Sequence, residues 1–99
     1  MKRGGCVYIM ASKRNGTLYV GVTSRLVERI YEHRTNAHEQ SFTAKYNCKI
    51  LVYYSIFVSI EDAIAEEKRI KAGNRKAKLE LIENMNPQWR DLWEEVKNW

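Results

Sequence analysis

The sequence has no long hydrophobic run and no secretory signal pattern. None of its apolar stretches approaches the roughly 20 residues that a membrane-spanning helix requires. Residues 1–5 are expected to lead straight into a strand rather than into the apolar core of a signal peptide. Internal repeats, low-complexity tracts and linkers are also lacking. These absences argue against a membrane protein and predict a soluble, cytoplasmic protein with one domain over residues 1–99.

Cysteine is scarce. Cys6 and Cys48 are the only two, they lack the CxxC spacing of metal and redox sites, and each lies in or beside a predicted strand. We therefore expect reduced thiols rather than a disulfide or a zinc site.

Positive charge is concentrated in the first half of the chain. Residues 1–49 contain nine Lys or Arg against three Glu, a formal charge of +6, whereas residues 50–99 contain eight against nine, or −1. A basic half favours a polyanionic partner, with nucleic acid the leading candidate. Basic cytoplasmic proteins that bind no nucleic acid are also common.

Two short stretches around Tyr8 and Tyr19 predict strands that are joined at Asn15-Gly16, a dipeptide suited to tight hairpins. A register that sets both tyrosines on one face would place two phenols beside Gly21. A ligand or another backbone can come close to such a glycine. The alternative is that the two aromatic rings only pack the hairpin.

Residues 25–36 predict a helix that follows a cap at Thr23-Ser24. Arg29 and His33 lie four residues apart along one edge of its apolar face. From that edge a cation and an imidazole can reach a cleft beside the sheet. The alternative is a solvated arginine and a half-buried histidine.

The next two segments predict a loop and a strand. Residues 37–48 form the loop, and Phe42, Lys45 and Tyr46 supply aromatic and basic groups of the kind that grip nucleic acids. These side chains are equally suited to anchoring the loop on the core. Residues 50–58 form a continuous apolar run typical of a strand buried on both faces, so we expect this strand to be central.

Glu67 occupies an unusual position on the helix that Ser59 and Asp62 are expected to cap. At about 100° per residue, it falls in the middle of the apolar stripe formed by Ile60, Ala63, Ile64 and Ile70. A buried carboxylate needs a cation, a metal or hydrogen bonds. Either Glu67 is functional, or it pairs with an internal arginine such as Arg29.

The last third of the chain offers a basic corner and a final helix. Arg75, Lys76 and Lys78 cluster after Gly73, which suits phosphate binding or ordinary helix-surface charge. Asn86-Pro87 predicts the start of a helix, with asparagine as the N-cap and proline at the first position. Its tryptophans recur at helical spacing, which indicates a structural role.

The order and spacing of these segments resemble the GIY-YIG nuclease superfamily. More closely, the chain is similar to small standalone bacterial proteins related to the N-terminal domain of the nuclease component of a repair excinuclease. Cys6 and Val7 stand where the first motif has glycine and isoleucine, and Ala72-Gly73-Asn74 stands where close relatives carry a Gly-Trp pair. The stretches that carry the resemblance are residues 7–10, 17–23, 27–33, 67–71 and 86–92.

The resemblance implies an α/β (α+β) fold, with a three-stranded antiparallel sheet over about residues 5–11, 17–22 and 49–58 and helices packed against it. It also implies phosphodiester hydrolysis with one divalent metal, Mg²⁺ or Mn²⁺, for which Glu67 is the single protein ligand. Tyr8 would orient or deprotonate the attacking water, and Arg29 would stabilise phosphoryl charge. Tyr19 and His33 would position groups or assist proton transfer.

The function so implied is a structure-selective endonuclease linked to DNA repair or processing, with DNA favoured over RNA and a protein partner supplying specificity. Two alternatives stay open: a nucleic-acid-binding module that does not cut, and a protein-interaction adaptor that uses the acidic face of the last helix. Gly21 and Asn86 are further site candidates, with Asp91 the second choice for the family's last polar position. The residues expected to contact nucleic acid are Arg25, Lys45, Lys71, Arg75 and Lys76.

Overall fold

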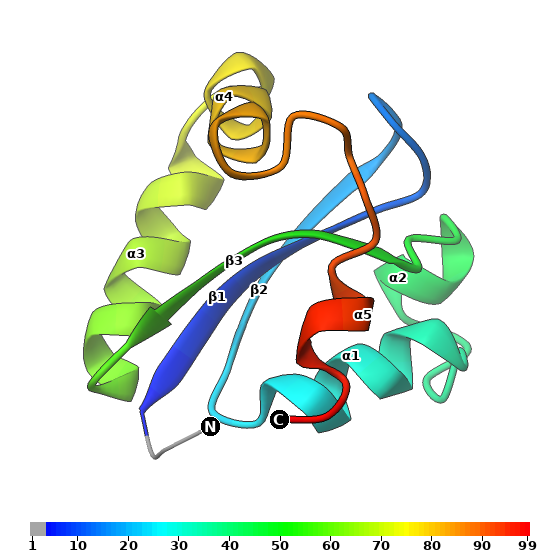
Figure 1. The fold of residues 1–99 in the computed structure, drawn as a ribbon, viewed down its shortest axis with the longest axis horizontal. Coiled ribbons are helices and arrows are strands. Elements are labelled where there is room, and N and C mark those ends of the chain that lie inside the picture. Colours follow the sequence, from blue (N-terminus) through cyan, green and yellow to red (C-terminus); the bar gives the residue numbers. More distant parts are fainter. Residues whose placement is uncertain (1–3) are drawn as a thin grey trace.

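The computed structural model describes residues 4–99; residues 1–3, expected to lead into the first strand, lie outside the described part. Three strands form one antiparallel sheet in the order β2-β1-β3, as the predicted fold class requires (Figure 1). The strands are β1 (Gly5–Ala11), β2 (Leu18–Thr23) and β3 (Ile50–Phe57). The helices of the described residues are α1 (Leu26–Arg34), α2 (Phe42–Lys45), α3 (Ile60–Ala72), α4 (Arg75–Met85) and α5 (Trp93–Val96).

The central strand is β1, so the prediction that residues 50–58 form the central strand is wrong. Every residue of β1 is buried, whereas β3 is half-buried along much of its length and exposes Ile56. The apolar run of β3 was misleading because apolar residues indicate only that both faces of a strand are buried. They do not indicate how many neighbouring strands it pairs with.

The C-terminal segment covers part of the outer edge of β3. The backbone N–H of Leu92 donates to the carbonyl of Leu51 at 2.8 Å, and the Leu51 N–H donates to a carboxylate oxygen of Asp91 at 3.2 Å. The adjacent Val52 is the extra residue of a register shift against β1, and its carbonyl accepts a bond from the Asn86 side chain. These bonds satisfy backbone groups that an edge strand leaves open.

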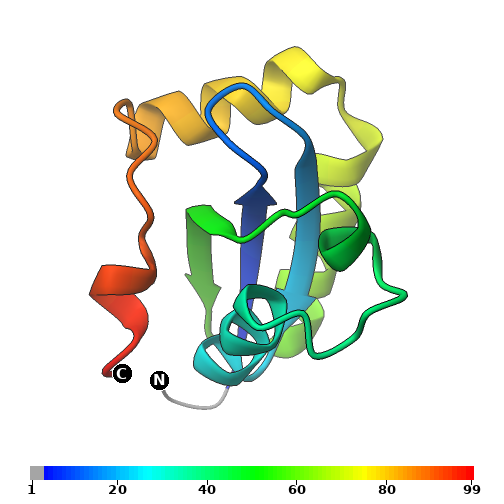
Figure 2. The same ribbon diagram turned by 90° about the vertical axis from the view of Figure 1, so that its right-hand side faces the viewer.

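Helices pack on both faces of the sheet, as two views of the ribbon show (Figures 1 and 2). Alternation along β1 sends Tyr8 toward α1 and α5, with Leu26, Ile30 and Val96 as neighbours in that half of the core. The other half of the core contains Val7, Ile9, Ala63, Ile70 and Ile82, where α3 and α4 pack. The two faces therefore carry different chemistry, with the tyrosines on the α1 side.

The two cysteines lie in or next to the first of these core halves. Cys6 and Cys48 are buried and form no disulfide with each other. Burial raises the pKa of the Cys6 thiol to about 11 and also raises that of Cys48, so both groups are thiols at neutral pH.

The hairpin and first helix differ from their predicted boundaries. The connection from β1 to β2 runs through residues 12–17, and Asn15 alone adopts a left-handed φ, of 57°. Thr23 does not cap α1 directly; its hydroxyl accepts a bond from the N–H of Arg25 at 2.9 Å. Part of the predicted loop at 37–48 is the short helix α2, which Ser41 caps by accepting a bond from the Ala44 N–H.

The C-terminal third also departs from the sequence expectation. Ser59 caps α3 as predicted, accepting a bond from the Asp62 N–H at 3.1 Å. Asn86 does not begin a helix. It ends α4, and the only later helix of the described residues is the four-residue α5.

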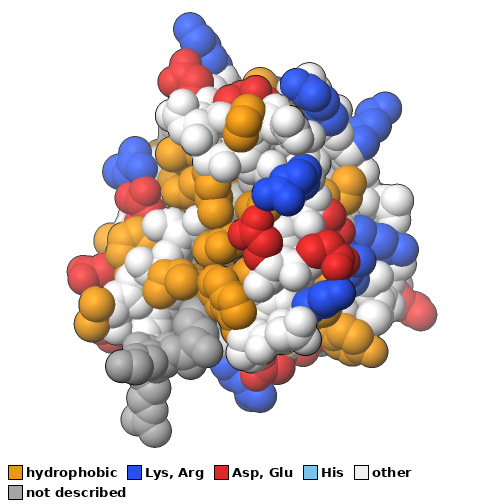
Figure 3. Space-filling view, in the orientation of Figure 1, with side chains coloured by type: hydrophobic (Ala, Val, Ile, Leu, Met, Phe, Trp, Pro, Cys, Tyr) orange, Lys and Arg blue, Asp and Glu red, His pale blue; other side chains and the backbone are white. Residues whose placement is uncertain are grey.

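No helix among residues 4–99 is long and apolar enough to cross a bilayer. On the face over β3, Lys and Arg side chains are interspersed with Asp and Glu around a band of hydrophobic side chains (Figure 3). This face is therefore not a uniformly basic surface.

Candidate active site

Tyr8 stands at the centre of the candidate site, on the middle strand and fully buried. Its hydroxyl lies 2.9 Å from Nε2 of His33, a residue of α1, which packs on the same face of the sheet. Gly21 is paired with Tyr8 across the strands, and a Cβ built there would lie 2.4 Å from the Tyr8 hydroxyl oxygen. The glycine thus leaves the space in which the phenol lies.

Tyr19 lies on the same face as Tyr8, as the sequence predicted for a suitable register. Tyr19 is paired with Met10, two residues along β1 from Tyr8, so both phenols point toward α1. The ring centroids of the two tyrosines are 6.3 Å apart, and those of Tyr19 and His33 are 5.5 Å apart in an edge-on arrangement. Two phenols and one imidazole therefore form a single aromatic cluster.

Thr43 holds the far side of the imidazole and was not among the predicted residues. Its hydroxyl lies 2.8 Å from His33 Nδ1, and the Ser41 hydroxyl lies 3.2 Å from the same Thr43 oxygen. Both nitrogens of His33 thus have fixed partners, Tyr8 on one side and Thr43 on the other. The only hint in the sequence was the Ser-x-Thr start of α2, inside a segment predicted as a loop.

Burial keeps the central pair neutral. Desolvation, followed by the nearby Arg29 charge, lowers the pKa of His33 to about 4. Desolvation, followed by Tyr19, raises the pKa of Tyr8 above its ordinary value, while Arg29 opposes this rise. At neutral pH a neutral phenol therefore faces a neutral imidazole. A neutral imidazole carries one N–H, so His33 donates to one of Tyr8 and Thr43 and accepts from the other.

Arg29 acts on this pair from a more exposed position. Its side chain is 45% exposed, and its Nε lies 3.2 Å from a carboxylate oxygen of Glu32. Glu32 is thus an ion-pair partner of Arg29, with 39% of its side chain exposed. Arg29 also lines an open groove of about 490 Å³ beside β2, between residues of α1 and α3, together with Arg25 and Ile64.

Glu67 approaches from the other face of the sheet. Helix α3 packs mainly on β1 and β2, and the Glu67 side chain is only 14% exposed. Its carboxylate accepts a bond from Lys71 Nζ at 2.9 Å, so the suggested pairing with Arg29 is wrong. The same Nζ lies 6.0 Å from the Tyr19 ring centroid. One ammonium group thus lies between the Glu67 carboxylate and the tyrosine cluster.

The predicted nucleic-acid contacts are scattered over several elements. Arg25 pairs with Glu28 at 2.9 Å, and Lys45 Nζ lies 5.6 Å from the Tyr46 ring centroid. Arg75 instead donates to the carbonyls of residues 15 and 16, both at 2.7 Å, and so ties α4 to the hairpin. Lys76 is exposed on α4.

Asn86 and Asp91 act as structural clamps through their hydrogen bonds. The buried Asn86 amide donates to the carbonyls of Val52 and Arg90, and its oxygen accepts a bond from the Arg90 N–H. The Asp91 carboxylate accepts bonds from Arg34 and from two backbone N–H groups. Both residues fasten the C-terminal segment to β3.

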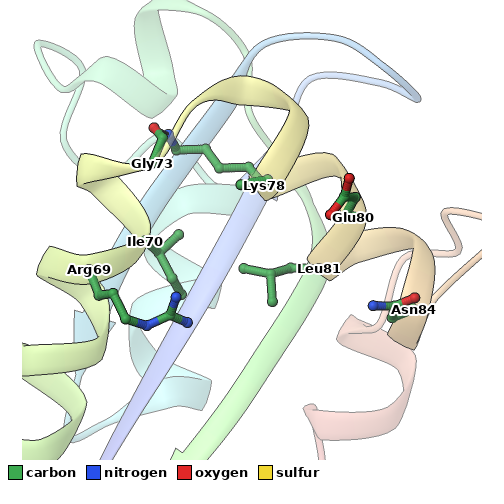
Figure 4. A pocket seen from close by; sticks show the side chains of 8 residues that line it. Arg69, Ile70, Gly73, Lys78, Glu80, Leu81 and Asn84 are labelled. Atoms are coloured by element: carbon green, nitrogen blue, oxygen red, sulfur yellow. Dashed lines mark hydrogen bonds between the residues drawn. The ribbon is translucent and has the colours of Figure 1, made fainter.

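A separate pocket of about 250 Å³ lies between α3 and α4 (Figure 4). Ile70 and Leu81 lie along it, with Arg69 and Glu80 among its polar residues. Lys78 extends along this pocket and donates to the Gly73 carbonyl at 2.8 Å. One lysine of the predicted basic corner, Lys78, therefore bonds to the C-terminal end of α3.

The donor set suits a hard cation that retains water. No group of three or more His, Cys, Asp or Glu in the described part of the chain could form an all-protein metal cage. Mg²⁺ usually keeps several waters and binds through one or two carboxylates plus substrate phosphates. The partly buried Glu67 fits this mode as a single carboxylate ligand, with Lys71 as the competing cation.

The sheet and its helices define an α/β protein, with the tyrosine–histidine cluster on the α1 face of the sheet. The chain belongs to the GIY-YIG family, since residues 4–80 match the model of the GIY-YIG catalytic domain. This family is one of nuclease domains that act on nucleic acid and generally use divalent metals.

Small bacterial relatives match along most of their length. A UPF0213 protein of Staphylococcus haemolyticus is 35% identical over 77 residues, covering 78% of this chain and 92% of that protein. UPF0213 proteins of Oceanobacillus iheyensis (38% identical; 78% and 87% covered) and Syntrophus aciditrophicus (30% identical; 83% and 92% covered) are also similar. No solved structure gives a significant match.

Proposed function

We propose that this protein is an endonuclease that hydrolyses phosphodiester bonds in DNA with Mg²⁺ or Mn²⁺, and that it selects DNA by structure during repair or processing. The observation that carries the proposal is the buried Tyr8–His33 hydrogen bond, held between Gly21 and Thr43 and facing Arg29. Because both ring nitrogens of His33 have partners, the imidazole is held in a fixed orientation toward the Tyr8 hydroxyl, which suits a proton-transfer pair.

In the proposed reaction, the oxygen of a water forms a bond to phosphorus while the bond from phosphorus to the leaving oxygen breaks, and the leaving oxygen takes up a proton from solvent. In the tautomer that carries the proton on His33 Nδ1, the Tyr8 O–H is donated to His33 Nε2, and the lone pairs of the Tyr8 oxygen orient the water. As the water loses its proton to the Tyr8 oxygen, the Tyr8 proton passes to His33. The substrate's negative charge favours this transfer by raising the pKa of the imidazole.

Arg29 stabilises the charge that develops on the phosphoryl oxygens. Tyr19 packs against the imidazole and closes the site from the β2 side. Glu67 would hold the divalent ion, which when bound supplies positive charge at the phosphate and lowers the pKa of bound water.

The test is to incubate the protein with single-stranded, nicked and branched DNA in Mg²⁺ or Mn²⁺. We expect cleavage of at least one substrate, and losses of about 10²-fold or more in Tyr8→Phe and Glu67→Gln. His33→Gln tests the proton path, and Glu94→Gln, an exposed carboxylate on α5, is the matched control. Cleavage that survives in Tyr8→Phe and Glu67→Gln alike would contradict the proposal.

One observation favours a second function, a nucleic-acid-binding module that does not cut. Glu67 already has a cation partner in Lys71, and Arg29 has an anion partner in Glu32. If these pairs persist with substrate present, binding without metal-dependent cleavage is expected. Binding and cleavage measured on the same substrates separate the two functions.

A further inference from the structure

Three aromatic side chains, Tyr19, Phe42 and Tyr46, form a continuous series that we call the aromatic ladder. The ring centroids of Tyr19 and Phe42 are 5.8 Å apart, and those of Phe42 and Tyr46 are 4.6 Å apart. At its inner end the ladder contacts Tyr8 and His33, at 6.3 and 5.5 Å from Tyr19. The ladder therefore begins at the candidate active site.

Exposure rises along the ladder from the inside outward. Tyr8 is fully buried, Tyr19 is half-buried, and Phe42 and Tyr46 are each 45% exposed. Residues that serve only to anchor a loop are expected to bury their rings. Here the outer two rings each leave nearly half of their surface open to solvent, next to a buried polar site.

The backbone under the ladder is held firmly. Within α2, Thr43 bonds to His33, and its carbonyl accepts a bond from the Cys48 N–H at 2.8 Å. Cys48 is itself buried, and Ser41 caps the first turn. The exposed rings are thus presented by a short helix that is fixed to the candidate catalytic histidine.

Cations accompany the rings. Lys45 Nζ lies 5.6 Å from the Tyr46 ring centroid, and Lys71 Nζ lies 6.0 Å from that of Tyr19. Residues 40–49 contain two lysines and no Asp or Glu. Flat apolar surfaces flanked by positive charge complement a ligand with π-faces and a negative backbone.

We propose that the aromatic ladder stacks unpaired bases, so that the substrate is single-stranded DNA or the unpaired strand of a branched DNA. This inference rests on the proposed function, in which DNA is the substrate. It adds a reason why the protein would select DNA by its structure. In a duplex each base is already stacked on both faces, whereas unpaired bases leave a face free for aromatic side chains. The ladder would hold such bases while the partly exposed Arg29 faces the adjoining phosphate.

The test measures binding without metal, so that it does not depend on cleavage. Fluorescence anisotropy in EDTA compares three labelled probes of equal length: an oligothymidylate, the same strand paired as a duplex, and a strand of abasic residues with the same phosphates. We expect the oligothymidylate to bind tightest. The abasic strand should bind at least about tenfold more weakly, because stacking contributes about 1–3 kcal/mol per base.

Leucine variants test the rings themselves. Phe42→Leu and Tyr46→Leu keep an apolar side chain but remove the π-face, and each should weaken oligothymidylate binding by about tenfold while leaving abasic binding unchanged. Phe42→Tyr should retain binding. The matched control is Tyr31→Leu, since Tyr31 is 59% exposed on α1 and lies outside the ladder.

Equal binding of the oligothymidylate and abasic probes, or of the Phe42→Leu variant and the wild type, would overturn the ladder proposal. Tighter binding of the duplex would overturn it as well. Ladder-dependent binding without any cleavage in Mg²⁺ or Mn²⁺ would support the ladder and refute the nuclease. Cleavage of all DNA forms with no ladder dependence would support the nuclease and refute the ladder.

Discussion

At the scale of single residues, the pairing of Gly21 with Tyr8 is the tightest constraint on the candidate site. Gly21→Ala places a methyl group 2.4 Å from the Tyr8 hydroxyl oxygen and ring. We expect a loss of about 1–3 kcal/mol in the free energy of unfolding, because overpacking forces side chains out of their preferred rotamers. Urea denaturation measures this loss, and cleavage should fall with it as the phenol is displaced.

Gly73→Ala is the matched control for this substitution. At Gly73 an added Cβ meets nothing closer than the Ile70 carbonyl oxygen at 3.4 Å, and the backbone φ is −78°. Its unfolding free energy should change little. Equal destabilisation by the two alanines would show that the Gly21–Tyr8 contact imposes no special constraint.

His33 predicts a dependence of stability on pH. Its pKa is about 4 in the folded protein and 6.5 for the free side chain, so between these values the unfolded chain binds a proton that the folded chain does not. The free energy of unfolding is therefore unaffected by protonation of His33 above about pH 6.5. It falls as the pH drops from 6.5 toward 4, because the proton binds the unfolded chain first. The slope is at most about 1.4 kcal/mol per pH unit.

Urea denaturation at several pH values between 4 and 8 measures this slope, with His33→Gln expected to reduce it. His38→Gln serves as the control, because His38 is 67% exposed and no comparable burial acts on it. The same slope in His33→Gln and in the wild type would rule out His33 as the titrating group.

At the scale of elements, local patterns predicted most strands and helices, but they could not predict the neighbours of each. Alternation along each strand is local and was predictable, but the common face of Tyr8 and Tyr19 depended on the register of the hairpin, which the observed pairing supplies. The sheet order was missed because an apolar run such as residues 50–58 looks alike in a central strand and in a covered edge strand.

The roles of two polar residues were missed for a similar reason. Asn86-Pro87 has the chemistry of a helix start, yet Asn86 bonds to Val52, 34 positions away, and ends α4 instead. Thr43 could not be predicted as a partner of His33 because its role depends on how the chain turns between α1 and α2. Tertiary contacts of this kind override local capping preferences.

The clamp of Asp91 on β3 gives the element-scale prediction. Asp91→Ala removes the acceptor from the Leu51 N–H, from the Trp93 N–H and from Arg34, and should cost about 2–3 kcal/mol of unfolding free energy. Amide hydrogen exchange at Leu51 should accelerate with it. Glu94→Ala, an exposed carboxylate on the next helix, should cost no more than about 0.5 kcal/mol. A similar cost for both would mean that Asp91 is not a clamp.

At the scale of the whole molecule, each half of the chain supplies a different part of the candidate site. Residues 1–49, with a formal charge of +6, supply the two tyrosines, Arg29, His33 and the aromatic ladder. Residues 50–99, with a formal charge of −1, supply Glu67 and Lys71 from α3. From this distribution of charge we expect a polyanion to approach over the first half, where Arg25 and Arg29 share the groove beside β2 with their partners Glu28 and Glu32.

This arrangement predicts how DNA binding depends on salt and on the position of a charge. Binding should weaken steeply with salt, with a slope in log units of about 0.7–0.9 per phosphate neutralised. Arg25→Glu and Lys76→Glu should each flatten the slope. Arg90→Glu is the control. It changes the net charge equally and breaks an exposed ion pair with Glu95, at 3.1 Å. Arg90 lies on the segment that covers β3. Its reversal should lower affinity slightly and leave the slope nearly intact. Anisotropy titrations at several salt concentrations measure the slopes. Equal flattening by all three reversals would mean that net charge attracts the DNA, and not the positions of Arg25 and Lys76.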